Sequence, residues 1–237
     1  ENIALSYNGG KDCIILLHLI AACLYRRHQA ALPGDGYLYP PIPGIYIAPD
    51  SPFPELEQFV WDSAAYYNLD LVQKGGSMKE ALADFLASEV GSKTKAILVG
   101  TRRTDPHGAN LSARDPTDND WPSFMRVHPI VDWDYHTVWI FLRELSVPYC
   151  GLYDEGYTSL GSTYNTHPNP YLADPEMEKG FAPAWMLEDG SQERAGREVT
   201  NHTQQTETEP EIGGEAAVAD TSGENAQVAD STAGGGE

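Results

Sequence analysis

The stretch IALSYNGGKDCIILL, residues 3–17, decides the fold. A short apolar run reaches the turn residues Asn8-Gly9-Gly10, and a second apolar run begins behind Asp12, which predicts a buried strand, a tight turn and a buried helix. Paired glycines let a ligand approach the backbone, and a helix N-terminus favours an anion. With the added positive charge of Lys11, the stretch predicts a phosphate site. A turn with a purely structural role is the alternative.

The spacing excludes two common phosphate loops. Gly9 and Gly10 adjoin Lys11, so the Gly-x4-Gly-Lys-Ser/Thr loop is absent, and Gly-x-Gly-x-x-Gly is absent too. Asp12, directly behind the glycines, would repel a phosphate unless Mg2+ or a positive substrate group lies between them. The stretch therefore predicts a phosphate site that works with a cation.

Strands and helices alternate outward from this stretch. The apolar patterns predict strands at 3–6, 45–48, 69–72, 96–99 and 124–128, and helices at 12–27, 54–67, 77–88 and 135–145. Residues 31–43 predict a loop. Ser77-Met-Lys-Glu80 fits a capping box, and Asp134 is the expected N-cap of the helix at 135–145. This alternation is typical of an α/β protein with a parallel, Rossmann-like sheet and helices on both faces. Ligands bind such sheets at the carboxyl ends of the strands, where the segments after Ser6 and Val99 leave.

Charge and composition divide the chain in two. Residues 198–237 contain nine acidic residues, no Lys or Arg and no aromatic side chain, so we expect an acidic, disordered tail. Residues 1–197 form the expected domain, and their excess of acidic residues argues against nucleic-acid binding. Because the chain begins in a strand without Met, we expect that a preceding segment is missing.

Composition also bears on the compartment. His18 interrupts the longest apolar stretch, which is too short to span a bilayer, so no membrane association is expected. Three widely spaced cysteines, Cys13, Cys23 and Cys150, predict buried reduced thiols rather than disulfides or a metal site. We expect a cytoplasmic monomer.

Four further segments carry candidate chemistry. GTRRTDP (100–106) leaves a strand with two arginines and a carboxylate, which suits phosphate and metal, although Arg103 and Asp105 could form an exposed ion pair. DPTDNDWPSF (115–124) presents aromatic rings for a planar ligand, unless Trp121 packs on the core. Residues 148–170 form a long loop, which is usually functional or mobile. ERAGR (193–197) holds the last basic residues, which could also be an ordinary helix end.

These motifs together resemble a known family. SYNGGKD (6–12) is similar to the pyrophosphate loop Ser-x-Gly-Gly-Lys-Asp-Ser of the N-type ATP pyrophosphatases, with Asn8 in place of a Gly and Cys13 in place of Ser. Together with SPFPELEQF (51–59), GTRRTDP, PTDNDWP (116–122), YTSLGS (157–162) and the 185–197 end, it resembles the FAD synthases of eukaryotes, FMN adenylyltransferases of the PAPS reductase-like type. The sequences WMLED (185–189) and RAGR (194–197) resemble the corresponding segments of fungal members.

The resemblance implies the reaction of FMN with MgATP to give FAD and pyrophosphate, and it implies roles for residues. Catalytic roles are implied for Asn8, Asp12, Asp105, Arg194 and Arg197, with Asp105 also as a candidate Mg2+ ligand. ATP contacts are implied for Ser6, Asn8, Gly9, Gly10, Lys11, Asp12, Tyr46, Ile47, Arg102 and Arg103. FMN contacts are implied for Asp118, Trp121, Arg126 and Trp185.

Two alternatives stay open. One is another ATP pyrophosphatase of the PAPS reductase superfamily, such as a sulfur enzyme, which would need a reactive cysteine on a mobile tail; no Cys follows Cys150. The other is a non-catalytic flavin- or nucleotide-binding module. Carboxylates beside a polyphosphate, Asp12 and Asp105, argue against a pure binder.

Overall fold

The computed structural model describes residues 2–28 and 39–198. Its sheet has the strand order β3-β2-β1-β4-β6-β5. The strands are β1 (Ile3–Ser6), β2 (Ile42–Ile47), β3 (Leu69–Lys74), β4 (Ala96–Leu98), β5 (Arg114–Pro116) and β6 (Met125–Val127). All neighbouring strands pair in parallel except β5 and β6. The α/β prediction is confirmed, with one antiparallel edge strand added.

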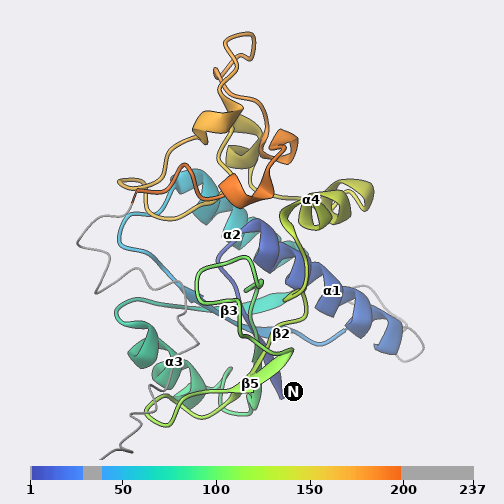
Figure 1. The fold of residues 1–237 in the computed structure, drawn as a ribbon. Helices are drawn as coiled ribbons and strands as arrows, with labels where there is room; N and C mark the ends of the chain where they lie inside the picture. The colour runs from blue at the N-terminus through green and yellow to red at the C-terminus, as the bar shows by residue number, and fades with distance from the viewer. Residues whose placement is uncertain (1, 29–38, 199–237) are drawn as a thin grey trace, which may run out of the picture.

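Helices cover both faces of the sheet (Figure 1). α1 (Lys11–His28), α2 (Pro54–Tyr66) and α4 (Tyr135–Glu144) lie on one side, and α3 (Met78–Ala87) lies on the other. Successive strand residues point to opposite faces, so Leu5 packs in the cluster beneath α1 and Ala4 in the cluster beneath α3. The chain runs from β1 outward to β3 and returns to β4 on the other side of β1. This reversal opens a crevice at the carboxyl ends of β1 and β4, the usual ligand site of such sheets.

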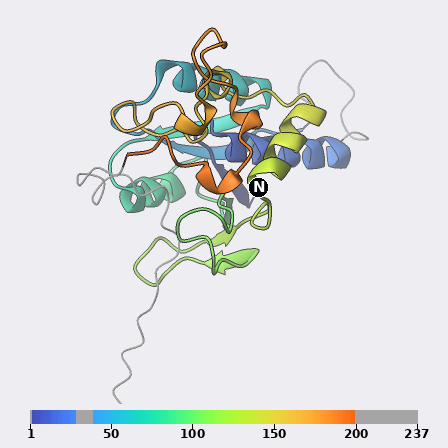
Figure 2. The ribbon, with the colours of Figure 1, turned by 45° about the horizontal axis from the view of Figure 1, so that its top comes forward.

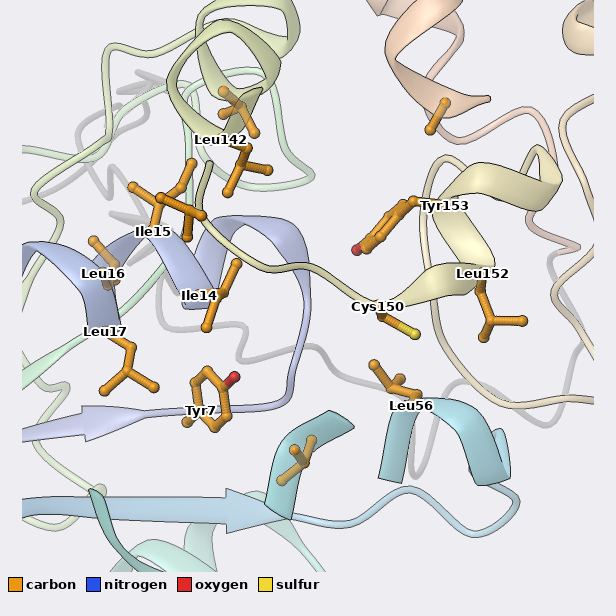
Figure 3. Packing of buried hydrophobic residues seen from close by; sticks show 14 of the residues in the cluster. Tyr7, Ile14, Ile15, Leu16, Leu17, Leu56, Leu142, Cys150, Leu152 and Tyr153 are labelled. Atoms are coloured by element: carbon orange, nitrogen blue, oxygen red, sulfur yellow. The ribbon is translucent and has the colours of Figure 1, made fainter. Parts of the chain in front are cut away.

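The larger core packs the first helix, α1, against the segment that follows α4 (Figure 3). Ile14, Ile15 and Leu17 of α1 are fully buried against residues of β1, α2 and α4. Tyr153, from a 3-10 helix at Gly151–Glu155, points its hydroxyl toward the beginning of α1, where it accepts a hydrogen bond from the Lys11 amide at 3.0 Å. The long loop after α4 is therefore packed onto the start of the first helix.

Most predicted elements are confirmed within one or two residues at each end. The predicted capping box is present at α3, where Ser77 Oγ accepts from the Glu80 amide at 3.4 Å and donates to its carboxylate at 2.7 Å. Asp134 caps α4 through the Thr137 amide at 2.7 Å. Residues 31–38 of the predicted loop and residues 199–237 of the predicted tail lie outside the described residues.

Two strand predictions were wrong in detail. β2 begins at Ile42 and includes Pro43, which the sequence placed in a loop; Pro43 pairs only toward β3, because β1 joins the strand from Gly44 onward. β5 was missed because its sequence, Arg-Asp-Pro, is polar and contains proline. Such a strand is tolerated at a sheet edge, where it pairs with β6 alone.

The prediction for residues 148–170 was incomplete. This segment contains the 3-10 helix at Gly151–Glu155 and the start of another at Pro170–Leu172, and it buries polar side chains such as Thr158 and Asn169. Two further 3-10 helices follow, at Ala184–Met186 and Gly190–Gln192. Backbone hydrogen bonds of the last residues to residues 165–167 hold the segment in place.

The cysteine prediction holds only in part. Cys150 is buried, but Cys13 is half-buried and Cys23 is exposed on α1, outside the stripe of α1 that packs on the core. No disulfide joins these three residues, all of which are described. In residues 2–28 and 39–198, no helix is both long and apolar enough to cross a bilayer.

The turn after β1 depends on Gly9. Its φ is +75°, and an added Cβ would lie 2.7 Å from Val60 Cγ2. We expect Gly9→Ala to lower the free energy of unfolding by about 2–4 kcal/mol through backbone strain and overpacking, measured by urea titration. Gly75→Ala is the matched control, since its added Cβ would meet no atom within 4 Å. Equal stability of the two variants would contradict this role.

Candidate active site

The turns after β1 and β4 meet at the start of α1. Gly100, just beyond β4, lies so close that an added Cβ would be 3.2 Å from Asp12 Cβ and 3.3 Å from the Cys13 amide nitrogen. In the first turn, Asn8 Oδ1 accepts a hydrogen bond from the Gly10 amide at 3.0 Å. The two motifs that the sequence singled out separately, around Gly9 and around Arg102, therefore form one site at the crevice.

Five charged side chains form a cluster at this meeting point, which we call the charged cluster: Lys11, Asp12, Arg102, Asp105 and Glu193. Arg102 Nε lies 3.0 Å from Asp12 Oδ1, and Arg102 Nη2 lies 3.1 Å from Asp105 Oδ1. Arg102 Nη2 also donates to both oxygens of Glu193, at 2.7 and 2.8 Å. Lys11 Nζ pairs with Glu193 and lies 3.3 Å from Asp12 Oδ2. Two cations thus face three carboxylates.

The cations lie deeper in the protein than the aspartates. The side chains of Lys11 and Arg102 are 3% and 1% exposed, whereas those of Asp12 and Asp105 are 20% and 19% exposed. The cluster therefore has its partly exposed side chains on the two aspartates and keeps its positive charges buried. Such a surface would suit a bound cation better than a bare phosphate.

Burial and charge pull the pKa values in different directions. Burial raises the pKa of Asp105 to about 6, against the attraction of Arg102, and Asp12 adds to the rise. Burial alone would also raise the pKa of Glu193, but Lys11 and Arg102 outweigh it and hold that pKa below its ordinary value. Burial would lower the pKa of Lys11, and Asp12 and Glu193 reverse this, so Lys11 stays charged. At neutral pH the cluster carries one net negative charge.

The two terminal arginines lie in the segment that Glu193 holds. Arg197 donates from Nη1 to the carbonyl oxygen of Leu160 at 3.1 Å, and its guanidinium lies against the backbone of Gly161. The Arg197 amide donates to the Arg194 carbonyl at 2.9 Å, so the pair sits on one tight turn. Figure 2 shows this last described segment, in orange, beside the dark blue start of α1.

Of the other residues predicted to contact ATP, three lie at or near the ends of β1 and β2, and Arg103 lies away from the charged cluster. Ser6 and Ile47 end β1 and β2 at the crevice, beside Tyr46, whose hydroxyl is buried without a hydrogen-bond partner within the described residues. Burial raises the pKa of Tyr46 to about 12, and Glu57 adds to the rise. Arg103 instead points to solvent, where its Nε donates to Asp132 at 2.6 Å. The structure thus does not bring Arg103 to the charged cluster.

Most of the predicted FMN residues lie around β6. Arg126 of β6 pairs with Ile97 of β4, so its side chain lies on the face of the sheet that α3 covers. Trp121 packs on the core cluster of the same face. Arg126 Nη2 donates to the Pro116 carbonyl at 2.8 Å, but Nε and Nη1 are buried without partners in the described residues. Burial lowers the pKa of Arg126, and the nearby negative charge of Asp118 opposes this effect. The Asp118 carbonyl accepts a hydrogen bond from the Trp121 amide at 3.0 Å.

Trp185 lies elsewhere. Its ring packs under the Arg143 guanidinium of α4, 3.7 Å from the guanidinium carbon to the ring centroid, and it lines a surface hollow with Ile140 of the same helix. It belongs to the core cluster beneath α1 and α4, whereas Trp121 belongs to the cluster beneath α3. The structure therefore separates Trp185 from the other three predicted FMN residues.

Comparisons with known proteins identify the family. The family model of the phosphoadenosine phosphosulfate reductase domain matches residues 2–88 and 78–168. The chain is 42% identical over 200 residues to a probable FAD synthase of Schizosaccharomyces pombe, covering 84% of this chain and 73% of that protein. It is 39% identical over 200 residues to a probable FAD synthase of Caenorhabditis elegans, of which it spans only 37%.

A solved structure agrees. The FMN adenylyltransferase of Candida glabrata, in complex with FMN and the ATP analogue AMPCPP, superposes with a TM-score of 0.72 at 32% identity, covering 83% of this chain and 81% of that one. The chain belongs to the FAD synthase family. This confirms the resemblance and the PAPS reductase-like fold, and it makes the chain a nucleotidyltransferase by family.

Two buried residues beside the predicted ones do not follow from the sequence motifs: Glu193 in the charged cluster and His128 beside Arg126. Glu193 stands first in ERAGR, and no local pattern links it to Lys11, 182 residues away. His128 is 1% exposed, and both ring nitrogens lack hydrogen-bond partners in the described residues, although Nε2 lies 3.9 Å from Asp115 Oδ2. Its spacing of two from Arg126 on a strand places both side chains on one face and could have revealed it.

The raised pKa of Asp105 makes stability depend on pH. Since the folded protein binds this proton more tightly than the unfolded chain, the contribution of Asp105 is favourable at low pH and is lost as pH rises through about 6. Asp105→Asn, which cannot ionise, should therefore match the parent protein only below the ordinary carboxyl pKa of 3.8, near pH 3. Above pH 7 it should be more stable by roughly 1–3 kcal/mol.

The measurement is urea unfolding of both proteins across this pH range, without Mg2+ or nucleotide. A parent protein more stable than the variant at pH 8 would contradict the prediction. The same variant should lose FAD formation, because its amide cannot replace the carboxylate.

Proposed function

We propose that this chain transfers the adenylyl group of MgATP to the 5'-phosphate of FMN, giving FAD and pyrophosphate. One observation carries the proposal: Asp12, in the first turn of α1, and Asp105, in the turn after the neighbouring strand β4, lie partly exposed beside two buried cations. Membership of the FAD synthase family supports it. We further propose that residues 1–197 form the catalytic domain of a cytoplasmic monomer that binds neither nucleic acid nor membranes.

The site fits Mg2+ as a substrate-bound ion. Among the described residues no group of three or more His, Cys, Asp or Glu side chains could hold a metal, but Mg2+ commonly takes one or two carboxylates and completes its shell with phosphates and water. Asp12 Oδ1 is buried and lacks a hydrogen-bond partner in the described part, although Arg102 lies close. Asp12 and Asp105 would hold the ion, which would neutralise charge on the phosphate oxygens.

The reaction needs positioning rather than a nucleophilic side chain. The second pKa of a phosphate monoester is about 6, so the FMN phosphate is largely dianionic at neutral pH and needs no general base. Its oxygen bonds to the α-phosphorus of ATP while the bond to the β-phosphate oxygen breaks, and pyrophosphate leaves with the electron pair. The start of α1 offers the positive end of its helix dipole to the phosphates, while the amides of Gly10 and Lys11 already donate to Asn8 Oδ1 and the Tyr153 hydroxyl. Arg194 and Arg197 would stabilise charge on the leaving group.

The flavin would take its place against Arg126. Buried guanidinium N–H groups without acceptors are costly, so a ligand that supplies electron-rich oxygen or nitrogen atoms would satisfy them. Trp121 offers a half-buried ring beside them for a planar ligand. β6 is the neighbour of β4, so this region lies one strand away from the strand that leads to Asp105.

Turnover is the first test. Incubation of the protein with FMN, ATP and Mg2+ should give FAD and pyrophosphate in equal amounts, separated by chromatography, and no FAD when Mg2+ is chelated. Binding of FMN and ATP without FAD formation would favour the non-catalytic binding module instead.

The flavin site is tested by Arg126→Gln. Loss of charged donors to the ligand should weaken FMN binding by about 10- to 100-fold, measured by quenching of flavin fluorescence, while the KM for ATP changes little. Arg114→Gln, an exposed arginine on the neighbouring strand β5, is the matched control. If both variants bind FMN as tightly as the parent protein, Arg126 has no place in the flavin site.

A further inference from the structure

Glu193 joins parts of the chain that are far apart in sequence. Its carboxylate pairs with Lys11 at the start of α1 and accepts from Arg102 after β4 at 2.7 and 2.8 Å. The side chain is 10% exposed. Lys11 and Arg102, two of the three cations that the resemblance assigns to ATP, are therefore engaged by this one carboxylate.

The backbone around Glu193 is held as well. Thr158 Oγ1 donates to the Glu193 carbonyl at 2.6 Å and accepts from Asn169 Nδ2 at 2.9 Å. Asn169 Nδ2 also donates to the Gln192 carbonyl at 2.8 Å. Thr158, Asn169 and Glu193 are buried, so position 193 is fixed both by its carboxylate and by its main chain.

The neighbouring loop spans the carboxyl ends of β1 and β2. The Thr158 carbonyl accepts from Lys11 Nζ at 3.1 Å, and five residues later the Thr163 amide donates to the Ser51 carbonyl, beyond β2, at 2.8 Å. Residues 158–163 thus run from the start of α1 to the segment after β2. Arg197 binds this loop at Leu160. The arginine turn is therefore placed relative to the crevice by the residues that Glu193 fixes.

We propose that Glu193 is a positioning residue: through Lys11 and Arg102 it sets the turn that carries Arg194 and Arg197 over the ATP phosphates. This inference rests on the proposed function and assigns the reaction a residue outside the phosphate loop. Arg194 follows Glu193 directly, and the turn closes three residues later with the Arg197 amide on the Arg194 carbonyl. An error of about 1 Å in such a group can cost two orders of magnitude in rate.

The first test is Glu193→Gln, which keeps the shape but removes the charge that holds Lys11 and Arg102. We expect kcat to fall about 10- to 100-fold, with FMN affinity by flavin fluorescence within about threefold of the parent protein. Glu188→Gln is the control, since Glu188 lies in the same segment but is exposed, and it should keep parental kcat. Unchanged kcat in Glu193→Gln would overturn the proposal.

A double-mutant cycle separates positioning from general stability. If Glu193 acts through the arginine turn, Glu193→Gln added to Arg197→Gln should lower kcat by less than threefold beyond Arg197→Gln alone, because the group that it positions is already gone. Multiplication of the two single losses would overturn the proposal.

Thr158→Val covers the case in which Glu193→Gln does not fold, because it removes the hydroxyl that holds the Glu193 main chain and leaves every charge in place. It should lower kcat at least threefold at unchanged FMN affinity, and parental kcat would overturn the proposal. If the parent protein itself forms no FAD, the proposed function fails, not the role of Glu193.

Discussion

The ion pairs of Glu193 with Lys11 and Arg102 are the interaction on which the site depends. Two cations buried to 3% and 1% exposure could not remain charged there without nearby carboxylates, because desolvation of an isolated charge is expensive. Removal of one partner from such a pair usually costs more than the pair contributes, so the arrangement favours one geometry over alternatives. Here that geometry ties the first helix, the turn after β4 and the last described residues into one unit.

The same electrostatics leaves the charges of Asp12 and Asp105 less well neutralised than the charge of Glu193. Glu193 holds the buried cations, so Asp12 and Asp105 share what attraction remains while they repel each other and Glu193. Burial and this repulsion raise the pKa of Asp105 to about 6. A bound cation would relieve that repulsion. Stability and activity therefore oppose each other at Asp105, as is common where a site is arranged for a ligand that is absent during folding.

The sequence predicted what depends on local patterns. The strand at 3–6, the cap at Ser77 and the cap at Asp134 follow from apolar periodicity and capping chemistry, which act over a few residues. The sequence did not predict β5, because pairing at a sheet edge does not require apolar side chains. The family motifs located Asp12 and Asp105, but they could not show that Arg103 turns to Asp132, because that contact joins residues 29 apart. Glu193 lies 182 residues from Lys11, beyond the reach of any local pattern.

The strand order explains why one cluster can serve two substrates. β4 lies between β1, whose turn forms the phosphate loop, and β6, which carries Arg126. Arg126 and His128 lie on the opposite face from α1, where the antiparallel β5 extends the sheet past α3. A flavin held there would need only its phosphate to reach the crevice. Because Arg102 and Asp105 lie in the turn after β4, the charged cluster lies beside the strand that separates the turn after β1 from Arg126.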